Sequence, residues 1–329
     1  MNQQTQPFVS TIIPVLNDPK RLQLCLEALE NQTYPKHLYE VLVVDNGSDE
    51  SIEPVVRQFK QAKMLLEPSP GSYTARNKGI LQAKGEVLAF TDADCIPQFD
   101  WLEKGTAHLL SVPNCGLVGG NVLFSFKNPH RPTAAELYDQ FFFLQQEYYL
   151  EYQQFAATAN VFTYKQVFEQ VGLFNSNLKS GGDREWGKRV FAAGYTQSFA
   201  ADAAICHPAR DSVQKLQRKV TRVARATYDL NRHRPNFPWV LLKFILADLK
   251  PPLRIWFRIG NNNRPNDLPY KLEFMTLLIW MKWVKAREKI KLLFTDFIPN
   301  QPRFRLPRPV NAEISKPREN GEVQPLNLD

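Results

Sequence analysis

The feature that most constrains this chain is an apolar run, residues 87–90, that leads at once into Asp92-Ala93-Asp94. Four consecutive apolar residues (Val-Leu-Ala-Phe) are typical of a strand covered on both faces. Open α/β sheets bind ligands at the carboxyl ends of such strands, and two carboxylates there suit a divalent cation such as Mg²⁺ or Mn²⁺. The alternative is that the Asp pair only caps a helix beginning near residue 97.

Strand-like and helix-like segments alternate before this run. The predicted strands are residues 8–15, 40–45, 64–66 and 87–90. The predicted helices between them are residues 22–29, 52–59 and 73–83. Alternation at this spacing predicts an α/β fold with a doubly wound, mostly parallel sheet flanked by helices. Further segments of the same domain are a strand at 115–126 and helices at 101–110, 134–155, 165–171 and 183–193.

Composition narrows the class of protein. The chain has 329 residues, of which 43% are hydrophobic and 22% charged, as in globular proteins. Its four cysteines are scattered, without a Cys-x-x-Cys pair, which argues against a zinc cage or a disulfide framework and fits a reducing compartment. The first seven residues lack the basic-then-apolar layout of a secretory signal, so we expect a cytoplasmic protein.

Charge divides the sequence near residue 210. Residues 1–209 hold 17 Lys and Arg against 22 Asp and Glu, whereas residues 210–329 hold 24 against 11. We therefore expect three regions: an acidic core domain at 1–210, a basic helical extension at 211–297, and a proline-rich flexible tail at 298–329. The basic region indicates an anionic partner, either nucleic acid or a membrane surface.

The basic extension has the pattern of amphipathic helices. Leu216, Val220 and Val223 keep helical spacing, with lysines and arginines on the other side. Residues 239–249 and 274–284 are rich in Trp, Leu and Ile, but charged residues interrupt them before the roughly 20 residues that a spanning helix requires. We expect these helices to lie on an anionic membrane surface, at the inner face of the cell membrane. The alternative is that they pack only on the core.

Six short motifs occur in order along the first two thirds of the chain. They are residues 9–17 (VSTIIPVLN), 31–35 (NQTYP), 43–49 (VVDNGSD), 75–79 (ARNKG), 92–94 (DAD) and 182–186 (GDREW). Together these motifs resemble those of the family 2 glycosyltransferases, over about residues 8–210. The resemblance implies a GT-A fold, a nucleotide-sugar donor and inverting transfer of a sugar.

The resemblance also implies where the donor and its metal bind. The donor would contact the end of the first strand, the turn after the second, and Arg76, whose guanidinium suits phosphate. The implied donor residues are Pro14, Val15, Asn17, Asp45, Asn46, Arg76 and Asp92. Where many relatives have a second acid, this chain has Asn46, which leaves the nucleobase open. A divalent metal, Mn²⁺ or Mg²⁺, would be held by Asp94, with Asp92 and His207.

The implied catalytic base is Asp183. Inverting transfer requires a carboxylate that takes the proton of the acceptor hydroxyl. The residue before this Asp is usually Glu in the family but is Gly182 here, so Glu185 stays an alternative base. Trp186 would lie either beside the acceptor cavity or in the core.

These features predict an inverting, metal-dependent glycosyltransferase of surface or extracellular polysaccharide synthesis. The acceptor would be a hydroxyl of a saccharide or of a lipid-linked intermediate. Two alternatives stay open: a nucleic-acid-binding protein that uses its basic C-terminal region, and a catalytically dead relative that acts as a scaffold. We expect no nucleic acid partner, because the sequence contains no recognition motif for one.

Overall fold

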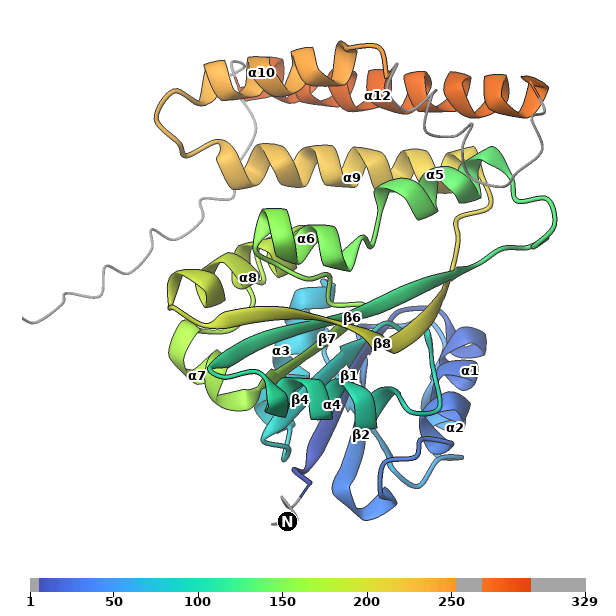
Figure 1. Ribbon diagram of the computed structural model, residues 1–329, viewed down its shortest axis with the longest axis vertical. Coiled ribbons are helices and arrows are strands. Elements are labelled where there is room, and N and C mark those ends of the chain that lie inside the picture. The colour runs from blue at the N-terminus through green and yellow to red at the C-terminus, as the bar shows by residue number, and fades with distance from the viewer. Residues whose placement is uncertain (1–5, 253–267, 297–329) are drawn as a thin grey trace, which may run out of the picture. The chain divides into compact units, whose positions relative to one another are not determined.

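The apolar runs form the central strands of one eight-stranded sheet in the computed structural model, which describes residues 6–252 and 268–296 (Figure 1). The strand order is β3-β2-β1-β4-β7-β6-β8-β5. Neighbours pair in parallel from β3 to β4 and between β6 and β8, whereas β7 and β5 run antiparallel to their neighbours. The strands are β1 (Val9–Val15), β2 (Tyr39–Asp45), β3 (Ala62–Leu66), β4 (Val87–Thr91), β5 (Ile96–Pro97), β6 (Cys115–Ser125), β7 (Asn160–Tyr164) and β8 (Thr196–Pro208). The predicted α/β fold with a mostly parallel sheet is confirmed.

Helices cover both faces of this sheet, which explains why its central strands are apolar throughout. Ile12 packs into the core on one face, whereas its neighbour Ile13 packs into the core on the other. Residues of α1, α2 and α4 fill the Ile13 side, and residues of α3, α7 and α8 fill the Ile12 side. These helices are α1 (Pro19–Glu30), α2 (Glu53–Val56), α3 (Ser72–Gln82), α4 (Trp101–Ser111), α7 (Lys165–Val171) and α8 (Gly182–Ala192).

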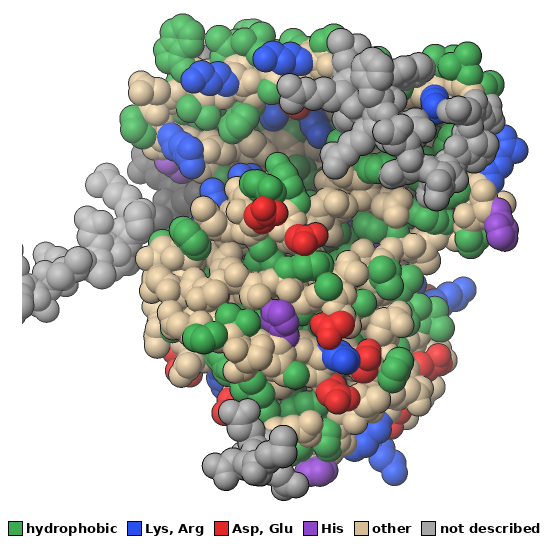
Figure 2. All heavy atoms as spheres, in the orientation of Figure 1, with side chains coloured by type: hydrophobic (Ala, Val, Ile, Leu, Met, Phe, Trp, Pro, Cys, Tyr) green, Lys and Arg blue, Asp and Glu red, His purple; other side chains and the backbone are tan. Residues whose placement is uncertain are grey.

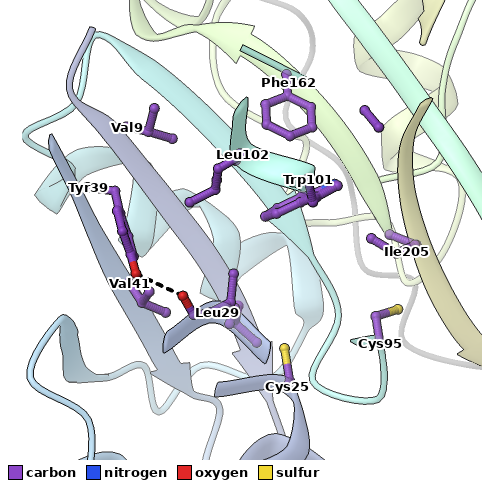
Figure 3. Close-up of a cluster of buried hydrophobic side chains, with 14 of the residues drawn as sticks. Val9, Cys25, Leu29, Tyr39, Val41, Cys95, Trp101, Leu102, Phe162 and Ile205 are labelled. Atoms are coloured by element: carbon purple, nitrogen blue, oxygen red, sulfur yellow. Dashed lines mark hydrogen bonds between the residues drawn. The ribbon is translucent and has the colours of Figure 1, made fainter. Parts of the chain in front are cut away.

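The core on the α1 and α4 side is closely packed (Figure 3). The ring centroids of Trp101 and Phe162 are 4.8 Å apart, and the Tyr39 hydroxyl donates a hydrogen bond to the carbonyl oxygen of Leu29 (2.8 Å). Gly105 lies so close to Phe162 that a Cβ atom would stand 2.2 Å from the ring. This contact fixes α4 against the sheet and positions the turn after β4.

Two segments differ from the sequence-based predictions. The helix predicted at 134–155 is two helices, α5 (Ala134–Phe142) and α6 (Gln146–Gln153), separated at Leu144, whose φ is +54°. The long strand β8 was not predicted, because its first half alternates small and polar residues instead of forming an apolar run.

The C-terminal helices form a further layer. They are α9 (Val213–Asn231), α10 (Phe237–Leu249) and α12 (Leu268–Asp296). α12 packs against α9, α10 and α5, through a cluster that includes Leu216, Val220, Phe274 and Met281 (Figure 1). The described residues belong to one compact unit, and the predicted tail, residues 298–329, lies outside them.

Candidate active site

The Asp pair stands where β4 ends, as the sequence predicts. The backbone turns immediately after the strand, with the Cys95 amide donating to the Asp92 carbonyl oxygen (3.0 Å). Potential ligand atoms of Asp92, Asp94 and Cys95 lie within 4.8 Å of one another. Burial and the two carboxylates raise the pKa of the Cys95 thiol, and hard cations prefer oxygen to sulfur. The two carboxylates are therefore the stronger candidate ligands.

His207, at the end of β8, completes this cluster. Its Nε2 atom lies 4.0 Å from Asp94 Oδ2, and its Nδ1 atom is 2.8 Å from the Pro208 carbonyl oxygen. A carbonyl oxygen only accepts hydrogen bonds, so Nδ1 carries the proton and the Nε2 lone pair faces Asp94 in the neutral ring. An imidazole fixed in this way is typical of a metal ligand. The donor set of His207, Asp94 and Asp92 therefore fits a divalent cation.

Arg76 reaches the same cluster from α3. Its side chain is only 4% exposed, and its guanidinium forms an ion pair with Asp92 Oδ1. Within the described ranges, Arg76 Nε has no hydrogen-bond partner. Arg76 therefore holds one oxygen of Asp92 and keeps a buried donor group unused.

Asn17 and Asn46 bind protein backbone at the carboxyl ends of β1 and β2. The Asn46 amide nitrogen donates to the carbonyl oxygens of Glu67 (2.9 Å) and Ser69 (2.8 Å), and its Oδ1 accepts from the Gly71 amide (2.7 Å). Asn17 Oδ1 likewise accepts from the amide of residue 49 (2.7 Å). Because these groups are already engaged, the structure gives the Asn46 side chain a role in shaping the loop that precedes α3, and its contact with the base stays a prediction.

Asp45 lies between these two asparagines. It is buried, and its Oδ1 accepts a hydrogen bond from the Ser48 amide (3.0 Å), which leaves Oδ2 without a partner among the described residues. In the register of β1 and β2, Pro14 lies beside Val44 and Val15 beside Asp45. The predicted donor residues of β1 and β2 are thus adjacent at one sheet edge.

Asp183, at the start of α8, shares a cavity with Arg76 and Asp92. The cavity has a volume of about 360 Å³ and also receives side chains from α6, α9 and α12. Glu185, the alternative base, does not line it and instead forms a salt bridge with Arg189 (2.8 Å). Of the two acids, only Asp183 is placed to meet a substrate in this cavity.

Tyr73 is a site residue that the sequence analysis missed. Its hydroxyl is 3.2 Å from Asp183 Oδ1, and burial, followed by the charge of Asp183, raises the pKa of this phenol. Tyr73 therefore stays protonated and donates to the carboxylate. A tyrosine at a helix start has an ordinary explanation as a core residue, and only its pairing with Asp183 distinguishes it.

The Tyr73 ring also explains why this chain has glycine at position 182, where the family usually has glutamate. A Cβ atom at Gly182 would lie 2.7–2.9 Å from three carbon atoms of the ring, closer than side chains pack. The space that a glutamate would need next to Asp183 is therefore filled by Tyr73. Trp186, one turn further along α8, is a core residue stacked on Phe168 with centroids 4.3 Å apart.

Known proteins share this architecture. Residues 10–172 match the model of the glycosyl transferase family 2. The chain is 42% identical over 266 residues to glycosyltransferase AglE of Haloferax volcanii, covering 79% of this chain and 83% of that protein. It is 24% identical over 226 residues, 64% of this chain and 69% of the relative, to a protein of Methanococcus voltae named dolichyl N-acetyl-alpha-D-glucosaminyl phosphate 3-beta-D-2,3-diacetamido-2,3-dideoxy-beta-D-glucuronosyltransferase.

The fold also matches a solved GT-A structure. The mannosyltransferase PcManGT from Pyrobaculum calidifontis, in complex with GDP-Man and Mn²⁺, aligns with a TM-score of 0.55 and 17% identity, over 91% of this chain and 77% of that one. Fold, motifs and relatives together define a glycosyltransferase. The chain belongs to glycosyl transferase family 2, which confirms the predicted family, fold type and enzyme class.

Proposed function

We propose that this protein transfers a sugar, with inversion, from a nucleotide-diphosphate sugar to a hydroxyl of a saccharide or lipid-linked acceptor in the synthesis of a surface or extracellular polysaccharide. The observation that carries the proposal is the shared cavity in which Asp183 faces Arg76 and Asp92. A base and a phosphate-binding group in one cavity are what a direct displacement requires.

The donor half of this site is the edge formed by β1, β2 and β4. Asp94, Asp92 and His207 would hold the divalent cation, Mn²⁺ or Mg²⁺, which supplies positive charge where the leaving diphosphate becomes more negative. The PcManGT complex with Mn²⁺ and GDP-Man supports this assignment. Arg76 would direct its unused Nε–H to a donor phosphate, a charge-assisted hydrogen bond that strengthens as the diphosphate departs.

The acceptor half is Asp183 with Tyr73. As the acceptor oxygen bonds to the anomeric carbon, the bond from that carbon to the diphosphate breaks and the hydroxyl proton passes to Asp183. Tyr73 and the Arg184 amide both donate to Oδ1 (3.2 and 2.9 Å), so Oδ2 is the oxygen left for the hydroxyl. Tyr73 thereby acts as a positioning residue that fixes the orientation of the base.

Two carboxyl-to-amide variants test this assignment. Asp183→Asn should reduce transfer by about 10²–10⁴-fold, the usual contribution of a general base, while a thermal shift with the donor and Mn²⁺ stays as in the wild type. Glu185→Gln is the matched control, because Glu185 pairs with Arg189 outside the cavity. If Glu185→Gln lost transfer while Asp183→Asn retained it, the base would be Glu185, and the assignment to Asp183 would be wrong. Loss of donor binding in Asp183→Asn would also contradict the role.

We further propose that α10 and α12 rest on an anionic membrane surface at the inner face of the cell membrane. No helix within residues 6–252 and 268–296 is long and apolar enough to cross a membrane. Large apolar side chains instead recur at helical spacing on the solvent side of both helices: Trp239, Leu242, Leu246 and Leu249 on α10, and Leu272, Ile279, Trp280, Trp283, Ile290 and Phe294 on α12. Figure 2 shows hydrophobic and basic side chains gathered over these helices. Trp and Leu interspersed with lysine are typical of helices in a membrane interface.

Liposome flotation tests the membrane proposal. Trp280 and Trp283 are 45% and 44% exposed and stack on each other (5.2 Å), so burying both in lipid contributes roughly 1 kcal/mol each. The double variant Trp280→Ser/Trp283→Ser should weaken binding to phosphatidylglycerol vesicles roughly tenfold or more. Phe99→Ser, an exposed aromatic residue before α4, is the control. Salt-sensitive binding to duplex DNA without vesicle binding would favour the nucleic-acid alternative.

A further inference from the structure

The wall of the active-site cavity is strongly cationic. Six cationic side chains line the cavity against the two carboxylates of Asp92 and Asp183, and one of the six, Arg76, is paired with Asp92. The other five are Lys179, Arg184, Lys219, Arg222 and Lys285. None of these five forms a salt bridge with a carboxylate in the described part of the chain. Side chains of α9 and α12 thus place positive charge beside the reacting groups, and no carboxylate of the described residues pairs with these five cations.

The donor does not provide the missing negative charge. A nucleotide-diphosphate sugar brings about two negative charges, and its divalent cation brings two positive ones, so the pair is close to neutral. The acidic groups that bind this pair, Asp92 and Asp94, belong to the other side of the site. After donor and metal have bound, the cationic wall would still lack a counter-ion, and unpaired charges in a partly enclosed cavity are costly.

Lys219 is the clearest member of this wall. Burial, together with the positive charges of Arg210 and Arg222, lowers its pKa to about 8, although Asp183 and Asp139 act in the opposite direction. Its ammonium group lies 5.4 Å from the centre of the Phe143 ring and has no hydrogen-bonded acceptor among the described residues. Lys285, on α12, lines the same cavity, and burial is likewise the main cause that lowers its pKa.

Resting on the function proposed above, we infer that the acceptor carries a phosphate group next to the hydroxyl that is glycosylated or within one sugar of it, and that Lys219, Arg222 and Lys285 bind this phosphate. A phosphate or diphosphate, with its several oxygens and higher charge, matches three cations that line one cavity better than a single sugar carboxylate does. The placement of α12 agrees with a lipid phosphate. Lys285 faces the cavity, whereas Trp283 and Arg287 on the same helix are exposed.

Calorimetric titration of the full-length protein tests the inference. The protein would be loaded with Mn²⁺ and a nucleoside diphosphate and titrated with farnesyl phosphate, farnesol, inorganic phosphate or glucuronic acid. We expect farnesyl phosphate to bind at least tenfold more tightly than farnesol or glucuronic acid, with inorganic phosphate competing weakly. Lys219→Met and Arg222→Gln should each weaken farnesyl phosphate roughly tenfold, the usual effect of losing one charged hydrogen bond. Lys219→Arg should retain binding.

Two controls separate this inference from the proposed function. Lys60→Met removes an exposed lysine remote from the cavity and should leave every titration unchanged. Mn²⁺-dependent release of nucleoside diphosphate by the wild-type protein without acceptor reports donor and metal binding independently of the acceptor phosphate. Equal affinity for farnesyl phosphate and farnesol, tighter binding of glucuronic acid, or unchanged affinity in Lys219→Met would overturn the phosphate site while leaving the transferase activity intact. A wild type that binds no nucleotide sugar would instead refute the proposed function.

Discussion

The contact between Gly182 and Tyr73 provides the sharpest test of how the base is positioned. We predict that Gly182→Ala lowers both stability and turnover, although Gly182 stands at the start of a helix where alanine is conformationally acceptable. The new methyl group would meet three ring atoms of Tyr73 at 2.7–2.9 Å, against about 3.5–4.0 Å for an ordinary carbon contact. The ring would therefore have to move by roughly 0.7–1 Å.

The surroundings of Tyr73 make this movement costly. The ring is buried, packs on Phe174 with centroids 5.7 Å apart and lies beside the Arg76 guanidinium. Overpacking of a core costs about 1–3 kcal/mol, and the loss of glycine freedom in the unfolded chain offsets up to about 1 kcal/mol. We expect a net loss of about 1–2 kcal/mol, or roughly 2–4 °C in melting temperature for each kcal/mol.

Turnover should fall more than stability. The hydrogen bond from the Tyr73 hydroxyl to Asp183 Oδ1 is 3.2 Å long. Moving the ring by roughly 0.7–1 Å therefore breaks this bond and leaves the carboxylate less firmly oriented. A misplacement of about 1 Å commonly costs up to 10²-fold in rate, so kcat should drop by about 10–100-fold with little change in the donor KM. Calorimetric melting and nucleoside diphosphate release at saturating donor measure the two effects.

A double-mutant cycle isolates the steric cause. Tyr73→Leu removes the ring, so adding Gly182→Ala to it should cost less than 0.5 kcal/mol of further stability, giving a coupling energy of about 1 kcal/mol or more. In the background of Tyr73→Phe, which keeps the ring, the clash should persist. The reasoning is refuted if Gly182→Ala melts and turns over like the wild type, or if it costs as much in the Tyr73→Leu background.

Two further predictions concern the metal and the cationic wall. His207→Ala should weaken Mn²⁺ binding about tenfold or more, as measured by electron paramagnetic resonance, because it removes the imidazole nitrogen that lies 4.0 Å from Asp94 Oδ2; equal Mn²⁺ affinity would exclude His207 as a ligand. Affinity for farnesyl phosphate should fall as pH rises through about 8, since Lys219 has its pKa lowered to about 8 and loses its charge above it, whereas Lys219→Arg should show no such fall between pH 7 and 9. A wild-type titration that is flat across this range would contradict the role of Lys219.

Two residues of the proposed donor half, Asp45 and Asp92, could be located from sequence because each follows a strong local signal. Strands β2 and β4 are buried on both faces, so their apolar runs and the turn after each were visible without a structure. Asp45 and Asp92 then lie at one edge of the sheet because parallel strands end there. The location of Asn46 was predictable, but its hydrogen bonds to the 67–71 loop were not, since they join residues 21 and 25 positions apart in the chain.

The acceptor half was less predictable because it depends on contacts between distant segments. Tyr73 meets Asp183 across 110 positions of the chain, and no local pattern marks that pairing. Strand β8 could not be predicted from the sequence, because it mixes small and polar residues and is bulged against β6 near Gly120. Lys219 belongs to a helix whose basic face suggested only a membrane or a nucleic acid, whereas the structure turns part of that face toward the cavity.

The division of the cavity between the sheet edge and the helices α9 and α12 has a consequence for how such enzymes diversify. The groups proposed to bind donor and metal are encoded up to residue 207, whereas Lys219, Arg222 and Lys285 are encoded after it. A gene fusion that joined a different helical segment near residue 210 would exchange one set of substrates and leave the bond-making chemistry untouched. The ion pair in which Arg210 Nη1 donates to both oxygens of the buried Asp139 carboxylate (2.8 and 2.9 Å) sets the condition for such an exchange. Any new segment must place an arginine beside Asp139. Otherwise the Asp139 carboxylate would stay unpaired in the interior.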